Sequence, residues 1–146
     1  MTSPNNLLQE QYRDEPWKMM ILCIMLNQTH YKQVYRVKDI FFDKWPSAED
    51  AMWANIDEMV EVLRPLGFYN RRTRTIRKFS YEWTMNGWRD IGELCGVGKY
   101  GRDSWMIFQE DTLPPDVTDK KLKEYIKWKN GVNATKQRKT ESQLTE

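Results

Sequence analysis

The amino-acid sequence predicts an all-α domain, and three observations support this fold class. Apolar residues recur at helical spacing along most of the chain, and the alternating pattern of strands is scarce. Proline and N-cap residues stand at the ends of these stretches. The length of 146 residues, with 40% hydrophobic and 13% aromatic content, is enough material for one core. Neither an internal repeat nor a second domain is visible.

The first half of the chain predicts four helices. Pro16 opens an apolar run that extends to residue 26, which indicates a central helix buried on nearly every face. Apolar residues at helical spacing between positions 34 and 41 predict a second helix, which must end before Pro46. Ser47 and Asn55 have N-cap chemistry, and each has an acidic residue three positions later. They predict the starts of two short helices.

The second half begins with a turn at Pro65 and Gly67. Apolar residues at positions 69, 76, 79 and 83 then mark one face of a longer helix. Residues 91–94 and 100–108 predict two further helices joined by a tight Gly-Val-Gly turn. We therefore expect a helix-hairpin-helix unit at about residues 91–108.

Thr118 is predicted to cap a last helix that extends to about residue 128, with Asp119 as the first residue inside it. Residues 130–146 are polar and lack hydrophobic periodicity, so we expect a disordered polar tail there. The folded domain is expected to span residues 7–129.

Composition excludes several classes of site. Cys23 and Cys95 are the only cysteines and His30 is the only histidine. Such a chain cannot form a disulfide scaffold, an all-protein zinc site or a four-cysteine iron–sulfur cluster, and we expect no metal and no cofactor. The longest apolar run is too short for a transmembrane helix, and the N-terminus does not resemble a secretory signal. We expect no membrane partner.

The net charge of +2 gives no reason by itself to expect a nucleic-acid partner. The charge is, however, unevenly distributed, because no acidic residue lies between Glu61 and Glu82. The basic residues of this stretch are Arg64, Arg71, Arg72, Arg74, Arg77 and Lys78. A local basic stretch is an electrostatic footprint for phosphates. A solvated helix face explains the same pattern equally well.

The Gly-Val-Gly turn is a second candidate phosphate contact. Glycines permit positive backbone torsions and close approach of another molecule, and the helix that follows points its free N–H groups at whatever docks there. The candidate contacts are Gly96, Gly98, Lys99, Gly101, Arg102 and, from the basic stretch, Arg71. A plain turn between helices is the alternative.

The segment 94–101 resembles the hairpin of the helix-hairpin-helix DNA glycosylase superfamily. Further matching stretches occur in the same order at residues 14–18, 26–29, 45–49, 66–69, 96–101 and 119–125. Together they are most similar to the methyl-CpG-binding-domain protein 4 family of mismatch-specific thymine/uracil glycosylases. The resemblance covers about residues 8–128 and implies the compact multi-helix fold of that superfamily.

The resemblance implies roles for two residues. Asp119, nineteen residues beyond Tyr100, matches the catalytic Asp of the superfamily. It would stabilise the positive charge that develops on the sugar and align or deprotonate the attacking water. Judged by local sequence alone, Asp119 is simply a helix-start residue. Tyr100 stands where strand-nicking members carry a nucleophilic Lys, which implies a monofunctional enzyme without lyase activity. Tyr100 could instead stack on or hydrogen-bond the flipped base.

The same resemblance implies contacts to the flipped base and to the gap it leaves. Gln9 matches a residue that reads the edge of the pyrimidine, and Asn27 would support the same wall of the base pocket. Gln28 matches one intercalating position, while Leu66 and Phe68 match the wedge loop. The ordinary alternatives are a core position for Phe68, helix caps for Asn27 and Gln28, and an exposed position for Gln9.

The resemblance thus predicts a monofunctional DNA glycosylase that excises thymine, uracil or related pyrimidines from mismatches with guanine in base excision repair. It would act as a monomer on double-stranded DNA, in the nucleus, by base flipping and Asp-assisted hydrolysis. One alternative is a non-catalytic helix-hairpin-helix DNA-binding module, which would not need Asp119. Another is an all-α interaction domain whose basic stretch is mere surface.

Overall fold

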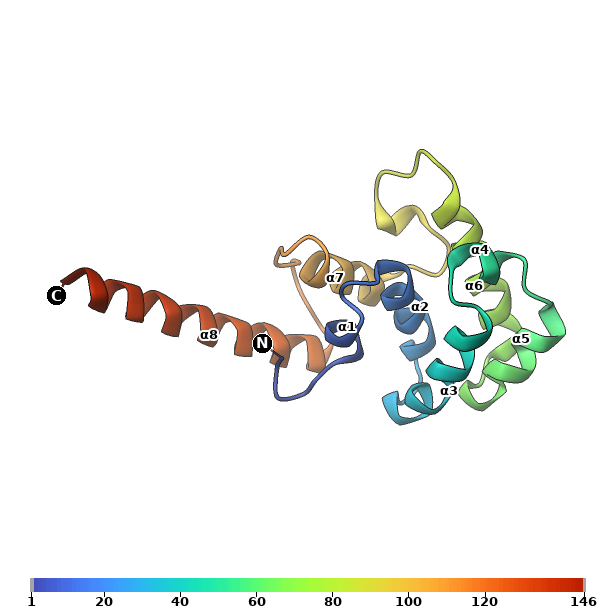
Figure 1. The fold of residues 1–146 in the computed structure, drawn as a ribbon, viewed down its shortest axis with the longest axis horizontal. Coiled ribbons are helices and arrows are strands. Elements are labelled where there is room, and N and C mark those ends of the chain that lie inside the picture. The colour runs from blue at the N-terminus through green and yellow to red at the C-terminus, as the bar shows by residue number, and fades with distance from the viewer. Residues whose placement is uncertain (1, 146) are drawn as a thin grey trace.

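The structure, a computed structural model, describes residues 2–145, which contain helices and no strand, so the all-α prediction is confirmed (Figure 1). The helices are, in chain order, α1 Leu8–Gln11, α2 Pro16–Leu26, α3 Tyr31–Lys44, α4 Ala48–Met52, α5 Ile56–Leu63, η1 Arg64–Leu66, α6 Tyr69–Thr84, η2 Ile91–Glu93, α7 Lys99–Phe108 and α8 Lys120–Thr145, where η marks a 3₁₀-helix. Within the described residues, none of these helices is long and apolar enough to cross a membrane.

Helix α2 forms the centre of the domain, with α1 and α7 on one side and α3–α6 on the other (Figure 1). Pro16 occupies its first turn, and the seven residues from Met19 to Met25 are all buried. A helix that is apolar on every face must be enclosed, so the neighbouring helices pack around it. The predicted central helix is therefore present with the expected ends.

The predicted N-caps of the two short helices are also present. The Ser47 Oγ accepts a hydrogen bond from the Asp50 N–H at 3.2 Å, and the Asn55 Oδ1 accepts one from the Glu58 N–H at 3.0 Å. The single histidine plays the same part for α3, because the His30 Nδ1 accepts from the Lys32 N–H at 3.2 Å. These caps satisfy backbone donors that a helix start leaves free.

Two elements differ from the prediction. The first arm of the hairpin is only the 3₁₀ turn η2, where the Asp90 side chain accepts from the Gly92 N–H at 2.7 Å. The Arg102 guanidinium lies so close to Gly92 that a Cβ there would be 2.1 Å from its Nη2. The short helix α1 was not expected at all, because four residues are too few to show a periodic pattern.

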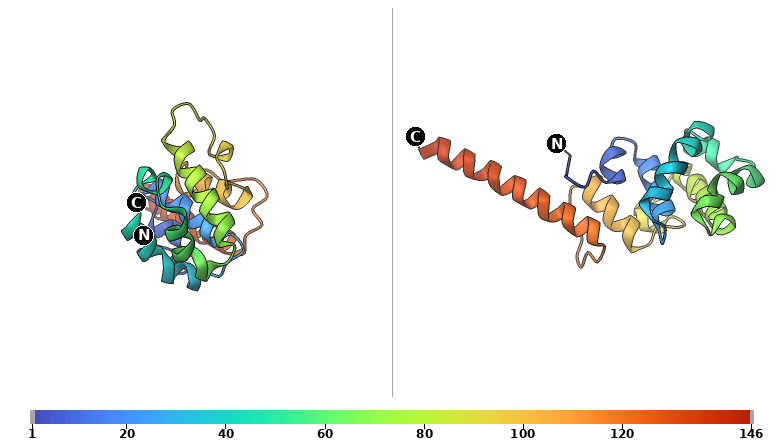
Figure 2. Two further views of the ribbon diagram at one scale, coloured as in Figure 1. Left: turned by 90° about the vertical axis from the view of Figure 1, so that its right-hand side faces the viewer. Right: turned by 90° about the horizontal axis from the view of Figure 1, so that it is seen from below.

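Helix α8 is longer than predicted and begins one residue later. Asp119 is its N-cap rather than its first residue, since the Asp119 Oδ2 accepts from the Leu122 N–H at 2.9 Å. The helix continues to residue 145, so the expected disordered tail is helical over residues 130–145, and residue 146 lies outside the described range. Strong helix formers such as Lys, Gln and Arg account for this, because they favour a helix without help from a core. This part projects away from the domain (Figure 2).

Candidate functional site

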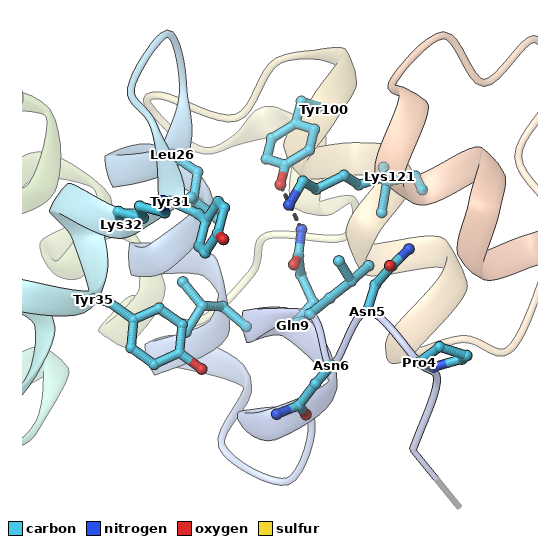
Figure 3. Close-up of a pocket in the computed structure, with 13 residues that line it drawn as sticks. Pro4, Asn5, Asn6, Gln9, Leu26, Tyr31, Lys32, Tyr35, Tyr100 and Lys121 are labelled. Atoms are coloured by element: carbon cyan, nitrogen blue, oxygen red, sulfur yellow. Dashed lines mark hydrogen bonds between the residues drawn. The ribbon is translucent and has the colours of Figure 1, made fainter.

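Two adjoining cavities of about 590 and 660 Å³ open where the N-termini of α7 and α8 meet the N-terminal segment and the α2–α3 turn. The residues Leu26, Tyr31, Tyr100 and Lys121 line both cavities, which are therefore two compartments of one cleft. Figure 3 shows the first compartment. The first compartment contains Gln9, and the second contains Asn27, Gln28 and Asp119. The structure thus brings both predicted base-pocket residues and both predicted catalytic residues to one place.

Gln9 is fixed at the bottom of the first compartment. It is only 2% exposed, which excludes the alternative of an exposed residue. Its Nε2 donates to the Tyr100 hydroxyl at 2.6 Å (Figure 3). The same nitrogen donates to the Ser104 Oγ at 3.3 Å. With both amide protons engaged, the Gln9 Oε1 remains as an acceptor. The Tyr100 hydroxyl accepts from Gln9 and so keeps its own proton to donate.

Burial keeps the two acidic hydrogen-bonding groups beneath the cleft neutral. Burial raises the pKa of Tyr100 above its ordinary value, and the negative charge of Asp119 adds to this effect. Burial also raises the pKa of the Cys23 thiol to about 12; its hydrogen bond to Ser104 opposes this, and the charge of Asp119 adds to it. Asp119 is therefore close enough to act electrostatically on both groups.

Asp119 is held by the helix that it caps. One carboxylate oxygen, Oδ2, is engaged by the Leu122 N–H, and the positive end of the α8 dipole stabilises the negative charge. Among residues 2–145, no partner is present for the other oxygen, Oδ1, and no basic side chain forms an ion pair with the carboxylate. A charged oxygen thus remains available to the second compartment. The same residues contain no group of three side chains that could bind a metal.

The hairpin joins the cleft through the first turn of α7. Gly96 has a φ of +81°, and a Cβ there would be 2.3 Å from the Thr75 Cγ2. Gly98 is the N-cap of α7 and has open space around it. Since Gly98 has no side chain to cap the helix, the first N–H groups of α7 have no side-chain partner within the described residues. This is the geometry that the sequence predicted for a phosphate contact.

The basic side chains near the hairpin are partly engaged. Lys99 forms an ion pair with the buried Asp103 at 3.0 Å, and it also lines the second compartment. Arg102 is exposed and lies against the backbone of Gly92. Gly101 is buried, and a Cβ there would be 3.4 Å from the Met20 Cε and the Val97 Cγ1. Gly98 is therefore the hairpin glycine with an open backbone.

The basic stretch does not form one uniform surface. Arg71, Arg74 and Lys78 are exposed on α6, as the prediction requires. Arg64 is exposed too, but its Nη2 pairs with the Glu61 carboxylate at 2.6 Å. Arg72, in contrast, is 5% exposed and points into the protein. Arg72 lies four residues before the core residue Ile76, and this helical spacing is the sequence signal that could have found it.

The structure exposes two of the three predicted intercalating residues and buries the third. Phe68 is 59% exposed, with a left-handed backbone at φ +48°, so it is not a core residue. Gln28 is also exposed and left-handed, at φ +60°. Leu66 is buried in the core at 5% exposure, so its side chain does not share the surface position of Phe68. Asn27 is exposed at the end of α2 and borders the second compartment.

The lining residues that sequence reasoning did not single out include Asn5, Tyr31 and Lys121. The Lys121 Nζ lies 4.0 Å from the centre of the Tyr31 ring, a cation–π contact that links α8 to α3 beside the cleft. The position of Lys121, two residues beyond Asp119, was the only available hint. Nothing in the sequence links Asn5 or Tyr31 to this site.

An all-helical domain with a Gly-x-Gly hairpin beside a cleft that holds a carboxylate fits the helix-hairpin-helix glycosylase architecture that the sequence resembles. Comparison with known families agrees: the family described as "HhH-GPD superfamily base excision DNA repair protein" matches residues 21–146. The chain belongs to this family. The resemblance found in the sequence is therefore confirmed.

Two relatives with known descriptions have similar sequences. A methyl-CpG-binding domain protein 4-like protein of Arabidopsis thaliana is 35% identical over 106 residues, which cover 73% of this chain and 24% of that protein. A thymine/uracil-DNA glycosylase of Pyrobaculum aerophilum is 27% identical over 131 residues, which cover 85% of this chain and 56% of that protein. The chain thus spans at most about half the length of these relatives.

Solved structures show the same fold. A thermostable thymine-DNA glycosylase matches with a TM-score of 0.61 at 23% identity, over 70% of this chain and 51% of that one. Endonuclease III, in a trapped covalent complex with DNA, matches with a TM-score of 0.54 at 20% identity, over 70% of this chain and 61% of that one. These matches establish the helical glycosylase architecture.

Proposed function

We propose that this protein is a monofunctional DNA glycosylase that removes thymine, uracil or related pyrimidines mispaired with guanine in double-stranded DNA. The observation that carries the proposal is that Asp119 opens on the same cleft as the hydrogen-bonded pair Gln9 and Tyr100. A group that reads a base and a group that assists cleavage of its glycosidic bond are both needed, and they must lie together. The protein would act as a monomer in base excision repair, in the nucleus.

The chemistry assigned to Asp119 follows from its charge. Cleavage of the N-glycosidic bond leaves positive charge on the sugar, and a fixed carboxylate nearby lowers the barrier. Asp119 can use Oδ1 for this purpose, because the hydrogen bond from Leu122 holds Oδ2. The same oxygen can align a water molecule and accept its proton as it attacks the sugar carbon. The products are a free base and an abasic site.

The hydrogen-bonding pattern of the first compartment favours uracil and thymine over cytosine. Both uracil and thymine carry an N–H donor at N3 between two carbonyl acceptors. The Gln9 Oε1 can accept from that N–H, and the Tyr100 hydroxyl can donate to a neighbouring carbonyl. Cytosine has an acceptor at N3, which would face the Gln9 oxygen without a proton between them. An unpaired acceptor buried in this way costs about 1–3 kcal/mol.

The surface of the cleft supports action on a base that has left the duplex. Removing a base from the stack costs a few kcal/mol, and the cost is lowest at a mismatch. The exposed side chains of Phe68 and Gln28 can fill the space that the base vacates. The open first turn of α7 after Gly98 can bind a backbone phosphate, and the exposed side chain of Arg71 on α6 can contribute a further phosphate contact.

Two features support hydrolysis without a covalent intermediate. The residue at the position where strand-nicking relatives carry a Lys is Tyr100, and burial keeps its hydroxyl protonated by raising its pKa. The amine of the adjacent Lys99 is engaged in an ion pair with the buried Asp103 carboxylate at 3.0 Å, so it is not free as a nucleophile.

The proposal is tested by incubating the protein with duplexes that differ at one pair, G·T, G·U or G·C, followed by alkali to cut abasic sites. We expect cutting of the G·T and G·U strands, an intact G·C strand, and no adduct trapped by borohydride. Binding without cleavage would favour the non-catalytic DNA-binding module, and a trapped adduct would contradict the monofunctional mechanism. Absent or salt-insensitive binding would favour an interaction domain.

A further inference from the structure

Gln28 and Phe68 are both exposed and have left-handed backbones, and they belong to loops that are 40 positions apart in the sequence. Gln28 lies in the turn between α2 and α3, and Phe68 lies between η1 and α6. Both loops contact the guanidinium of one buried residue, Arg72 on α6. This arrangement connects the loops directly behind the two side chains.

Arg72 uses its two terminal nitrogens to hold one loop each. Its Nη1 donates to the carbonyl oxygens of Leu66 at 2.6 Å and Gly67 at 2.7 Å. Its Nη2 donates to the carbonyl oxygen of Asn27 and, at 2.5 Å, to the Thr29 Oγ1. The acceptors therefore lie immediately before Phe68 on one loop, and on both sides of Gln28 on the other.

Thr29 adds a direct bond between the two loops. Its hydroxyl accepts from Arg72 and donates to the Leu66 carbonyl at 3.2 Å. The Arg72 guanidinium also lies 5.6 Å from the centre of the Phe68 ring. Arg72 therefore contacts the loop of Phe68 in two ways: it donates to backbone carbonyls just before Phe68, and it lies beside the Phe68 ring.

The charge of Arg72 has no carboxylate partner among residues 2–145, and every acceptor it uses is a carbonyl or a hydroxyl oxygen. Burial lowers the pKa of this guanidinium from its ordinary value. A planar fork with several fixed donors can bridge four acceptors, whereas the compact ammonium of a lysine cannot. Left-handed conformations of residues other than glycine persist only where neighbouring groups fix them, and Arg72 does this for both loops.

We propose that Arg72 is a positioning residue that locks the two loops together, so that Gln28 and Phe68 enter the DNA as one unit. This inference rests on the proposed function, because it assigns a role in taking the base out of the duplex. Arg72 itself contacts neither the base nor the sugar. Its loss impairs removal of the base from the duplex and leaves the cleft and Asp119 in place.

The test measures base unstacking separately from cleavage. A 2-aminopurine next to the mismatched pyrimidine of a G·U duplex becomes fluorescent when its neighbour leaves the stack. All proteins carry Asp119→Asn, so that binding can be followed without chemistry. We expect the fluorescence rise of this parent to fall at least fivefold on adding Arg72→Lys, and to fall less on adding Thr29→Val, which removes one acceptor. Arg138→Lys, an exposed position far along α8, is the matched control and leaves the rise unchanged.

A second measurement uses proteins that retain Asp119. Excision of uracil from the G·U duplex is compared with excision from a single strand, where no pairing partner holds the base. We expect Arg72→Lys to slow excision from the duplex at least tenfold more than excision from the single strand. Equal slowing on both substrates, or an unchanged fluorescence rise, would overturn the inference. No excision by the wild-type protein on either substrate would overturn the proposed function instead.

If the Arg72→Lys protein does not fold, the Thr29→Val protein still tests the inference. Thr29→Val removes one hydroxyl acceptor and leaves the backbone of the loop and the Arg72 guanidinium in place. An unchanged fluorescence rise in the Thr29→Val protein would then overturn the inference. No rise with the Asp119→Asn parent, despite binding, would also overturn it, since neither loop would then enter the stack.

Discussion

Replacing Gly96 by alanine adds a methyl group where the hairpin has no room for one. The backbone there has a φ of +81°, and the new Cβ would lie 2.3 Å from the Thr75 Cγ2. A left-handed residue with a side chain costs about 1–2 kcal/mol, and overpacking costs about 1–3 kcal/mol more. We therefore expect Gly96→Ala to lower the free energy of unfolding by about 2–5 kcal/mol, which corresponds to a fall in Tm of ~10 °C.

Gly98→Ala is the matched variant, because nothing lies within 4 Å of a Cβ at that position and its φ is −99°. Its cost is that of a poorer N-cap, about 0.5–1 kcal/mol. Thermal unfolding followed by circular dichroism measures both variants, and a titration of DNA at low salt measures their affinity. We expect Gly98→Ala to remain folded but to bind DNA more weakly, since its methyl group obstructs the open turn. Equal Tm values for the two variants would refute this account of the hairpin.

Three further predictions concern the cleft. Asp119→Ala removes the cap of α8 and lowers the free energy of unfolding by about 1 kcal/mol, whereas Asp119→Asn keeps an acceptor for the Leu122 N–H and costs less. Equal free energies of unfolding for the two variants in urea would exclude the capping role. The free energy of unfolding falls as pH rises above about 9, because the unfolded chain then releases protons that buried Cys23 and Tyr100 retain. The fall is up to ~1.4 kcal/mol per pH unit for each of these two groups. Cys23→Ala should make this slope shallower, and an unchanged slope would contradict the prediction. Tyr100→Phe removes the hydroxyl that orients Gln9 and lowers kcat/KM on G·U DNA about tenfold; an unchanged kcat/KM would refute its role.

The elements predicted correctly are those with strong local signals. Pro16 and the apolar run after it fix the start and the burial of α2, and Ser47 and Asn55 cap their helices because each N-cap acts within three residues. Residues 130–145 are helical in the structure although their sequence is polar and aperiodic, because their residues favour helices. Hydrophobic pattern alone does not distinguish these two cases.

The sequence likewise led to some residues of the candidate site and not to others. Resemblance to a family led to Gln9, Tyr100 and Asp119, and the fold brings all three to one cleft although they are far apart in the chain. Arg72 was grouped with surface charges, because composition says nothing about the direction of a side chain. The contacts of its guanidinium are made by loops that meet only in three dimensions.

Single-turnover excision of uracil from a G·U duplex measures what the Asp119 carboxylate contributes to the reaction. Asp116 is exposed, left-handed and three residues before Asp119, so Asp116→Asn is a matched removal of one negative charge from the same segment. We expect Asp116→Asn to cut at the wild-type rate and Asp119→Asn to be slower by about 10²–10³-fold or more. Excision by Asp119→Asn at the wild-type rate, or equal slowing of both variants, would contradict the claim that the carboxylate of Asp119 drives the reaction.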